Sequence, residues 1–241
     1  DIERILAALP SSITNLNMSY VDHTDNGFSI NSFSRLGYLT GLQSLDVSRI
    51  AFSSYHNNVI GQILQNLFQL RELRLRWLYT NLTQVAQALK PSLQLLDLSC
   101  HPSFNALNDE ENQIALGMAL QNPFLHLRYL YLENMNIGNS SQGNIELAQG
   151  LRAQTNLKVL DLSDNELGYS SNVNVHVLLR SLPFSLTSLD VSVNPIGSQD
   201  SFEVTELSRA VKNMSGLIYF KAGGQNHYFN ALGKSSDFLQ A

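Results

Sequence analysis

The segment Leu157-Lys-Val-Leu-Asp-Leu-Ser-Asp-Asn-Glu-Leu-Gly168 decides the fold of this 241-residue chain. The same pattern returns 29 residues later as Leu186-Thr-Ser-Leu-Asp-Val-Ser-Val-Asn-Pro-Ile-Gly197. A third copy, which begins at Leu127, keeps every position of the pattern except the asparagine. The shared pattern is Leu-x-x-Leu-x-Leu-x-x-Asn-x-Leu-Gly, and its recurrence indicates a chain built from repeats.

Looser copies of the pattern extend over the rest of the chain. They begin at Ile13, Leu42, Leu70, Leu93 and Leu217. The eight starts are separated by 29, 28, 23, 34, 30, 29 and 31 residues. One such copy alone could arise in an amphipathic helix, but a spacing this regular over the whole chain predicts a repeat protein.

Each copy predicts a strand followed by a helix. Leu160 and Leu162 alternate with the polar Asp161, so the two leucines point inward and the aspartate points outward. A turn rich in Asn, Gly and Ser follows, and then apolar residues recur at helical spacing. These helical stripes are Val59, Ile63, Leu64 and Leu67; Val85, Ala86 and Leu89; Val175, Leu178, Leu179 and Leu182; and Val204, Leu207 and Val211.

One strand–helix unit cannot bury its apolar side alone, so neighbouring units stack and share a core. The fold class predicted is α/β, as a single domain over residues 1–241 with a concave parallel sheet and convex helices. Only Asn165 and Asn194 supply the asparagine at position nine, which predicts less regular turns in the amino-terminal half. The other copies carry Val21, Ile50, Leu78, His101, Met135 and Gln225 there. Residues 227–241 depart from the repeat and are predicted to cap the last layer.

The period of 28–29 residues and the strand–helix alternation resemble the ribonuclease-inhibitor-like class of leucine-rich-repeat proteins. The resemblance covers about residues 2–226 and implies a horseshoe-shaped solenoid. Members of the class act as inhibitors, receptor sensors, GTPase regulators and bacterial effector scaffolds. The Asn/Ser-rich, cysteine-poor repeats resemble those of intracellular bacterial pathogens. The vertebrate inhibitors are rich in cysteine and this chain has one, so the resemblance does not imply ribonuclease inhibition.

Composition limits the classes of partner. The net charge of −5 and the pI near 5.6 do not indicate the basic surface that a nucleic-acid-binding protein needs. The sequence has no Lys/Arg-rich run to attract a membrane surface, and no apolar stretch approaches the 18 residues of a spanning helix. A single cysteine, Cys100, favours a reducing compartment or a bacterial protein. Residues 2–9 read as a helix already in progress, which favours a longer natural protein.

No catalytic or cofactor motif is recognised. The six histidines have no metal-ligand spacing, and the sequence contains no glycine-rich phosphate loop. Cys100 and His101 are adjacent, so on a strand they would face opposite sides and would not form a nucleophile–base pair. The sequence predicts no enzyme, no cofactor and no metal.

The outward strand positions are the candidate binding surface. The middle position reads Asn17, Asp46, Arg74, Asp97, Tyr131, Asp161, Asp190 and Lys221 along the stack. Asp followed by Ser two residues later is ordinary for this repeat, so the copies that abandon it are the informative ones. The residues predicted to bind a partner are Tyr20, Arg49, Arg71, Arg74, Arg76, Trp77, Tyr129, Tyr131 and Glu133.

Trp, Tyr and Arg are enriched at binding hot spots, which favours a protein partner on the concave face, centred on copies three to five. The alternative is that Trp77 packs under the turn and that the arginines pair with Asp46, Glu72 and Asp97. The long spacing before copy five points to an insertion over residues 101–112, in which Asp109, Glu110 and Glu111 are read as acids at a helix start.

The function predicted is a non-catalytic protein-interaction module, in a bacterial effector that acts on host proteins. The alternatives are a GTPase-activating or other regulatory repeat protein, and the recognition domain of an enzyme whose catalytic part lies outside this segment.

Overall fold

The repeats form one open sheet of eight parallel strands in sequence order, β1 to β8. The computed structural model describes residues 2–20, 33–50, 58–77, 82–99, 110–168, 174–197 and 201–223. The strands are β1 (Asn15–Asn17), β2 (Ser44–Asp46), β3 (Glu72–Arg74), β4 (Leu95–Asp97), β5 (Tyr129–Tyr131), β6 (Val159–Asp161), β7 (Ser188–Asp190) and β8 (Tyr219–Lys221). Each predicted copy therefore supplies one strand, and the fold is the predicted leucine-rich-repeat solenoid.

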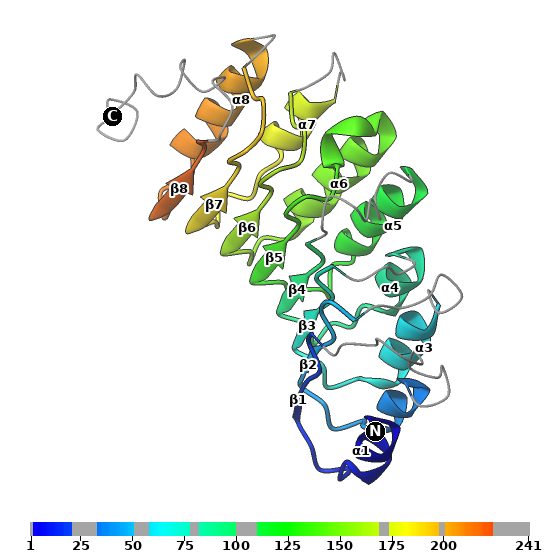
Figure 1. Cartoon of the computed structure of the whole chain (residues 1–241). Coiled ribbons are helices and arrows are strands. Elements are labelled where there is room, and N and C mark those ends of the chain that lie inside the picture. Colours follow the sequence, from blue (N-terminus) through cyan, green and yellow to red (C-terminus); the bar gives the residue numbers. More distant parts are fainter. Residues whose placement is uncertain are drawn as a thin grey trace.

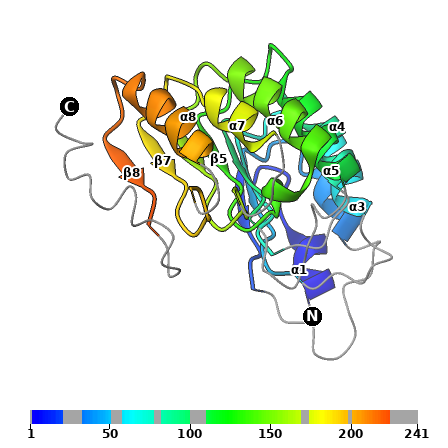
Figure 2. The ribbon, with the colours of Figure 1, turned by 90° about the horizontal axis from the view of Figure 1, so that it is seen from above.

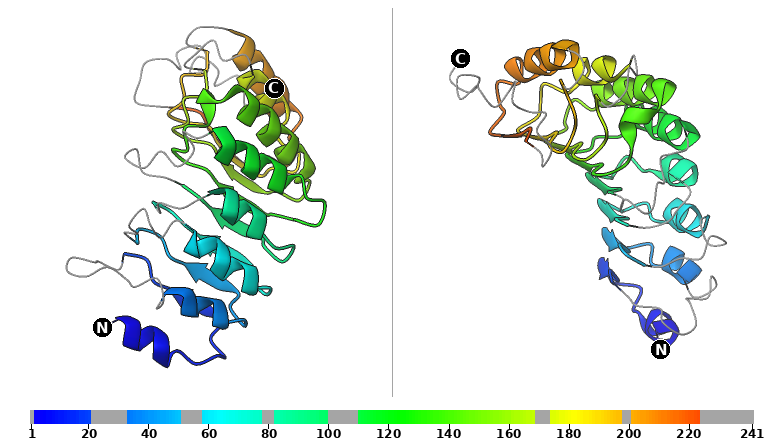
Figure 3. Two further views of the ribbon diagram at one scale, coloured as in Figure 1. Left: turned by 90° about the vertical axis from the view of Figure 1, so that its right-hand side faces the viewer. Right: turned by 45° about the horizontal axis from the view of Figure 1, so that its top comes forward.

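Helices lie on the outer side of the curved sheet (Figure 1). They are α1 (Ile2–Ala8), η1 (Arg35–Tyr38), α3 (Val59–Asn66), α4 (Leu82–Ala88), α5 (Glu110–Leu120), η3 (Ile137–Asn139), α6 (Ser141–Ala153), α7 (Val175–Arg180) and α8 (Ser201–Lys212). Figure 2 shows the helices covering one face of the sheet, and the right-hand view of Figure 3 shows the strands along the inner side of the bend. The outward strand residues therefore line a concave face.

The core lies between the sheet and the helices. Leu160 and Leu162 are fully buried, as the alternation predicts. Three predicted helical stripes are buried in full or in large part: Val59, Ile63, Leu64 and Leu67; Val85, Ala86 and Leu89; Val175, Leu178, Leu179 and Leu182. In the fourth stripe Leu207 and Val211 are buried and Val204 is partly buried. Helical spacing thus identified the face of each helix that packs on the sheet.

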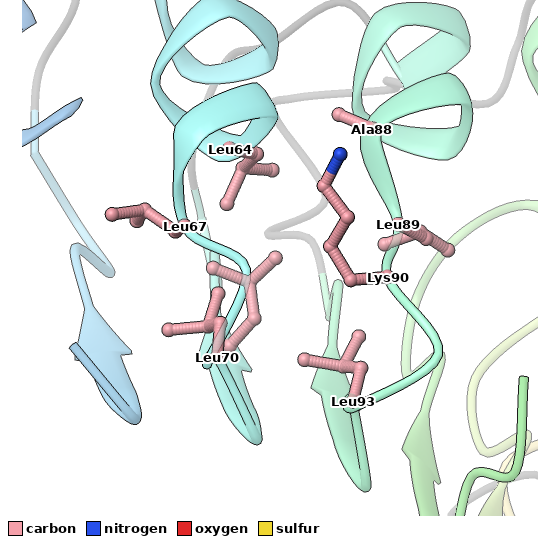
Figure 4. Close-up of a pocket in the computed structure, with 8 residues that line it drawn as sticks. Leu64, Leu67, Leu70, Ala88, Leu89, Lys90 and Leu93 are labelled. Carbon is pink, nitrogen blue, oxygen red and sulfur yellow. The ribbon is translucent and has the colours of Figure 1, made fainter. Parts of the chain in front are cut away.

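Packing between neighbouring repeats is close at two places in the core. Between α3 and α4 it leaves a cavity of only about 10 Å³, lined by leucines such as Leu64, Leu70 and Leu93 (Figure 4). That volume holds about one water molecule, so the cavity is a packing gap and no ligand site. The α5–α6 pair packs through glycines, because a Cβ on Gly150 would lie 2.6 Å from the carbonyl oxygen of Gly117.

The asparagine at position nine bonds the turn of the preceding repeat. Asn194 Oδ1 accepts hydrogen bonds from the backbone of Asn165 and Leu167, at 2.9 and 3.0 Å. Its Nδ2 donates to the carbonyl of Leu162 at 2.8 Å. Asn165 does the same one repeat earlier, where it accepts from the backbone of Met135. The two asparagines are buried because these bonds satisfy their amides.

Up to position eight, the described turns of both halves have the same backbone form. The predicted irregularity of the amino-terminal turns falls largely on residues 21–32, 51–57, 78–81 and 100–109, which lie outside the described residues. At position eight the backbone is left-handed in both halves, with φ near +60° at Tyr20, Arg49 and Trp77 and also at Asn134, Asp164 and Val193. In each case the N–H donates to the position-seven carbonyl of the next repeat. This backbone ladder needs no asparagine at position nine. Of the residues that replace the asparagine, Val21, Leu78, His101 and Gln225 lie outside the described residues.

The acids at the end of the insertion begin a helix, as predicted. Glu110 and Glu111 form the first turn of α5, while residues 100–109, including Asp109, lie outside the described part of the chain. Glu110 also reaches the next helix, because its Oε1 accepts from Ser140 Oγ at 2.9 Å and from the Gln142 backbone at 3.3 Å. The predicted cap, residues 227–241, likewise lies outside the described residues.

Candidate functional site

The strand register aligns the candidate residues along the concave face. Arg74 pairs with Asp46 of β2 and Asp97 of β4, and Tyr131 pairs with Asp97 and with Asp161 of β6. Neighbouring strands lie about 4.8 Å apart, so side chains at the same repeat position on adjacent strands can contact one another. The predicted middle row therefore exists as a continuous line of side chains across the eight strands.

The Asp-x-Ser copies have a structural role. The side-chain oxygen of Asp46 accepts the backbone N–H of Ser48 at 2.9 Å, and the same bond recurs at Asp97, Asp161 and Asp190. Asn17 makes it in copy one. This bond folds the chain at the end of these five strands, as Asx turns do. Copies three and five carry Arg and Tyr at this position, and their outward side chains are available for other contacts.

We call Arg74, Arg76, Tyr129, Tyr131 and Glu133 the central patch. Arg76 Nη2 lies 2.9 Å from Glu133 Oε2 across the one strand between their copies, because copy four carries only a small, buried serine, Ser99, at this position. Arg74 Nη1 lies 2.9 Å from Glu72 on its own strand. The side chains of Arg76 and Glu133 remain 43% exposed, so a partner can reach them.

Asp97 lies beneath the central patch. It is only 4% exposed, and Arg76 Nε lies 3.7 Å from its Oδ2. Burial raises the pKa of Asp97 above its ordinary value, although the hydrogen bonds from Ser99 and the charges of Arg76 and Arg74 oppose the rise. Sequence reasoning set Asp97 aside as consensus. Asp97 lies in copy four, between the two copies that carry the candidate residues, and this position in the strand order could have identified it as part of the site.

Charge and burial also shift the pKa values of Tyr131 and Glu133 in copy five. Burial raises the pKa of the Tyr131 phenol above its ordinary value, and the negative charge of Asp97 adds to the rise. Burial likewise raises the pKa of Glu133, while the charge of Arg76 lowers it. Tyr131 therefore stays a neutral hydrogen-bonding phenol at neutral pH, which suits polar contact with a partner.

Tyr20, Arg49 and Trp77 form a second group, which we call the Arg49 stack. The guanidinium of Arg49 lies 3.5 Å from the ring centroid of Trp77 and 4.4 Å from that of Tyr20. The three residues occupy position eight of copies one to three, where the common left-handed backbone aligns them. Stacking of the cation on both rings fixes their orientation, and Tyr20 stays 65% exposed.

Arg71 does not join the central patch. It precedes β3 and is exposed, and strand alternation places Arg74 and Arg76 on the other side of the chain. The arginines do pair with Glu72 and Asp97, as the alternative predicted, whereas the Asp46 carboxylate accepts from Ser48. Trp77 is half-buried and stacks on Arg49.

No catalytic centre is assigned to the site. In the part of the chain that the structure describes, no cluster of three His, Cys, Asp or Glu residues could hold a metal ion. The same part contains no helix that is both long and apolar enough to cross a membrane. Cys100 and His101 lie outside the described residues.

No family model matches the chain, and no curated protein matches it. Among solved structures it is similar to the leucine-rich repeat-containing protein LegL7 from Legionella pneumophila, with 16% identity and a TM-score of 0.45, over 93% of this chain and 87% of that one. It is also similar to TLR13 in a complex with ssRNA13, with 17% identity and a TM-score of 0.42, over 95% of this chain and 36% of that one. Similarity at this level carries no information about ligands. The chain's own repeats and strand register make it a leucine-rich-repeat solenoid.

Proposed function

We propose that the protein binds another protein on the concave face of its sheet, through the central patch. The observation that carries the proposal is the replacement of Asp-x-Ser in copies three and five. Arg74 with Arg76, and Tyr131 with Glu133, stand where five of the other six copies carry the turn-forming pair, while copy eight carries Lys221 and Gly223. These replacements forgo the Asx-turn bond, and they gather arginines and tyrosines, the residue types of binding hot spots.

The Arg49 stack extends this surface toward copy one. Tyr20 and Trp77 offer large rigid rings that Arg49 already orders, so binding would cost little side-chain entropy there. Arg49 N donates to the Arg76 carbonyl at 2.8 Å, so the stack adjoins the central patch. The proposed contact therefore runs from copy one to copy five and recognises its partner without catalysis.

We also propose that the partner is a host protein and that the chain is part of a bacterial effector. The Asn/Ser-rich, cysteine-poor repeats support this proposal, since one cysteine suits a reducing compartment. Capture from eukaryotic and from bacterial lysates separates the two sources of partner. A partner recovered only from the bacterial lysate would contradict the host assignment.

The test of the binding site is affinity capture with the purified chain, read by mass spectrometry. We expect wild type to recover a protein that the double variant Arg74→Glu, Tyr131→Ala loses. The matched control makes the same two changes outside the central patch, as Arg71→Glu, Tyr219→Ala, because both residues are exposed there. Circular dichroism confirms that each variant is folded.

Equal recovery by the patch variant and by wild type would overturn the concave site. Acceleration of GTP hydrolysis by a captured GTPase would favour the regulatory alternative, and the same variants would then test whether the concave face carries it.

A further inference from the structure

The loops that lead from each helix into the next strand contain no acidic residue. They are residues 9–14, 39–43, 67–71, 89–94, 121–128, 154–158, 181–187 and 213–218, and all lie within the described residues. The chain has 20 Asp and Glu residues, so their exclusion from all eight loops is a strong charge asymmetry. We call these loops together the strand-entry edge.

Backbone hydrogen bonds join the eight loops into one continuous edge. Gln43 N donates to the Thr14 carbonyl at 2.7 Å, and Arg71 N donates to the Gln43 carbonyl at the same distance. The bonds continue from repeat to repeat up to Ile218 N, which donates to the Thr187 carbonyl at 2.8 Å. Residues from loops about 30 positions apart in sequence are therefore neighbours along this edge.

Four cations lie on the strand-entry edge: Arg71, Lys90, Arg128 and Lys158. Among the described residues, none of the four is within ion-pair distance of a carboxylate. Lys158 Nζ donates to the carbonyl of Ser185 at 3.2 Å, and Lys90 Nζ lies 4.8 Å from the ring centroid of Phe68. Figure 4 shows Lys90 at the end of α4, beside the apolar layer. No described carboxylate therefore forms a direct ion pair with these four cations.

Large apolar side chains are exposed on the same edge. Phe68 is 65% exposed, Phe124 69% and Phe184 59%, and they stand at the entries to copies three, five and seven. Ile218 is 89% exposed at the entry to copy eight. Holding such side chains in water is unfavourable, and a row of them on one rigid edge marks an interaction surface.

We propose that the strand-entry edge attaches the protein to an anionic lipid surface. Cations interleaved with aromatic side chains are the composition that binds at a bilayer interface, where the cations meet anionic headgroups and the rings enter the acyl boundary. The opposite edge, where the strands end, carries acids such as Asp164 and Glu166 and would face away from the lipid. The concave face stays free for a protein partner.

The spacing of the rings favours lipid over a nucleic acid. Phe68, Phe124 and Phe184 occupy alternate repeats, about 9–10 Å apart at the strands, which is too far for successive bases to stack on them. A lipid surface has no such repeat and accepts rings at any separation. An acidic polypeptide is the competing class of partner, and polyglutamate is the probe that tests it.

The experiment is co-sedimentation with vesicles of phosphatidylcholine, either alone or mixed with phosphatidylserine. We expect wild type to bind only the mixed vesicles, and we expect binding to weaken with salt because the attraction is screened. Arg71→Glu and Arg128→Glu should each lower the vesicle partition coefficient by at least about fivefold. Phe68→Ser with Phe124→Ser should lower it as well.

Two controls separate the edge from the concave face. Arg74→Glu reverses a cation three residues from Arg71, and Tyr20→Ser removes a ring of similar exposure beyond the strand end. Neither change should alter vesicle binding. Failure of wild type to bind the mixed vesicles, or equal loss in the control variants, would overturn the proposal. Binding of polyglutamate or of a single-stranded oligonucleotide without vesicle binding would also overturn it.

The single tryptophan gives a readout of orientation. Trp77 lies beyond the strand ends, so brominated lipid should not quench its fluorescence when the protein is bound. In the variant Trp77→Phe, Phe124→Trp the new indole stands on the strand-entry edge and should be quenched. Quenching of Trp77 and not of the new indole would assign the opposite edge to the lipid and would contradict the proposal.

Discussion

Arg76 and Glu133 form an ion pair at 2.9 Å although 57 residues separate them in the sequence and a whole strand lies between them. The pair crosses above copy four, where Ser99 is small and buried, and it joins copies three and five into one surface. Glu133→Gln should change the free energy of unfolding by less than about 1 kcal/mol, because both side chains are 43% exposed and water screens the pair. Urea unfolding measures this. A larger loss would mean that the pair holds the repeats together and does more than shape the surface.

Asp97 should limit stability at neutral pH. Its pKa is raised in the folded state by burial, so the folded protein binds a proton more readily than the unfolded chain. The stability that this group contributes is greatest below the unfolded pKa and is lost as pH rises through the raised folded pKa. Asp97→Asn keeps the acceptor for the Ser99 backbone and removes the charge, so it should match or exceed wild type at neutral pH.

The comparison that checks Asp97 is a pH series of urea unfolding curves. The advantage of Asp97→Asn should shrink as pH falls through the raised pKa. Asp97→Ala removes the acceptor as well and should cost about 1–3 kcal/mol, because the buried Ser99 N–H loses its partner. An asparagine variant that is less stable than wild type at neutral pH would show that the Arg76 contact outweighs burial.

Glu206 should give stability the opposite pH dependence to that of Asp97. It is 1% exposed and accepts two hydrogen bonds from Arg180, each at 3.1 Å, and further bonds from Arg209. The side-chain bond from Arg180 is the main reason that the pKa of Glu206 is lowered below its ordinary value. Its stabilising contribution is therefore present above the unfolded pKa and is lost as pH falls through the lowered folded pKa.

Glu206→Gln tests this dependence. The variant should unfold at lower urea than wild type at neutral pH, and the two proteins should converge as acid protonates Glu206. Asp190→Asn is a suitable control, because its partner Lys221 is an exposed lysine at 3.3 Å and the pair should contribute little. A difference between Glu206→Gln and wild type that persists unchanged into acid would assign the effect to packing.

Close packing of α5 and α6 should make Gly117 intolerant of a side chain. An added Cβ would collide with the backbone of Glu146, which cannot rotate away. Gly117→Ala should lower the free energy of unfolding by about 1–3 kcal/mol. In Gly216→Ala the nearest atom is 3.9 Å from the new Cβ, so this control should stay close to wild type. Equal unfolding midpoints for both variants would show that the helices can separate without cost.

The Arg49 stack should be visible in fluorescence, because Trp77 is the only tryptophan. Arg49→Ala removes the cation that lies 3.5 Å from the indole and exposes that face of the ring to water. We expect a red-shifted emission and a stability loss of about 0.5–1 kcal/mol, as for cation–π contacts near a surface. Arg49→Lys should keep part of the effect. An unchanged spectrum in Arg49→Ala would mean that other contacts hold the ring.

The sequence by itself determined the repeat, the strand in each copy and the buried face of the helices. Leu160 and Leu162 are buried and Asp161 faces outward because alternation on a strand is a local property of the chain. The bonds of Asn165 and Asn194 were equally predictable, since a side chain that bonds turn backbone does so wherever the turn recurs.

Only the tertiary structure decided which residues share a surface. In the structure Arg76 lies beside Glu133, Asp97 lies beneath them, and Arg71 lies on the strand-entry edge. The sequence shows no basic run, yet stacking brings Arg71, Arg128 and Lys158 from separate repeats onto one edge that carries no acid. A solenoid makes neighbours of residues about thirty positions apart, so its surfaces are read across the repeats and not along the chain.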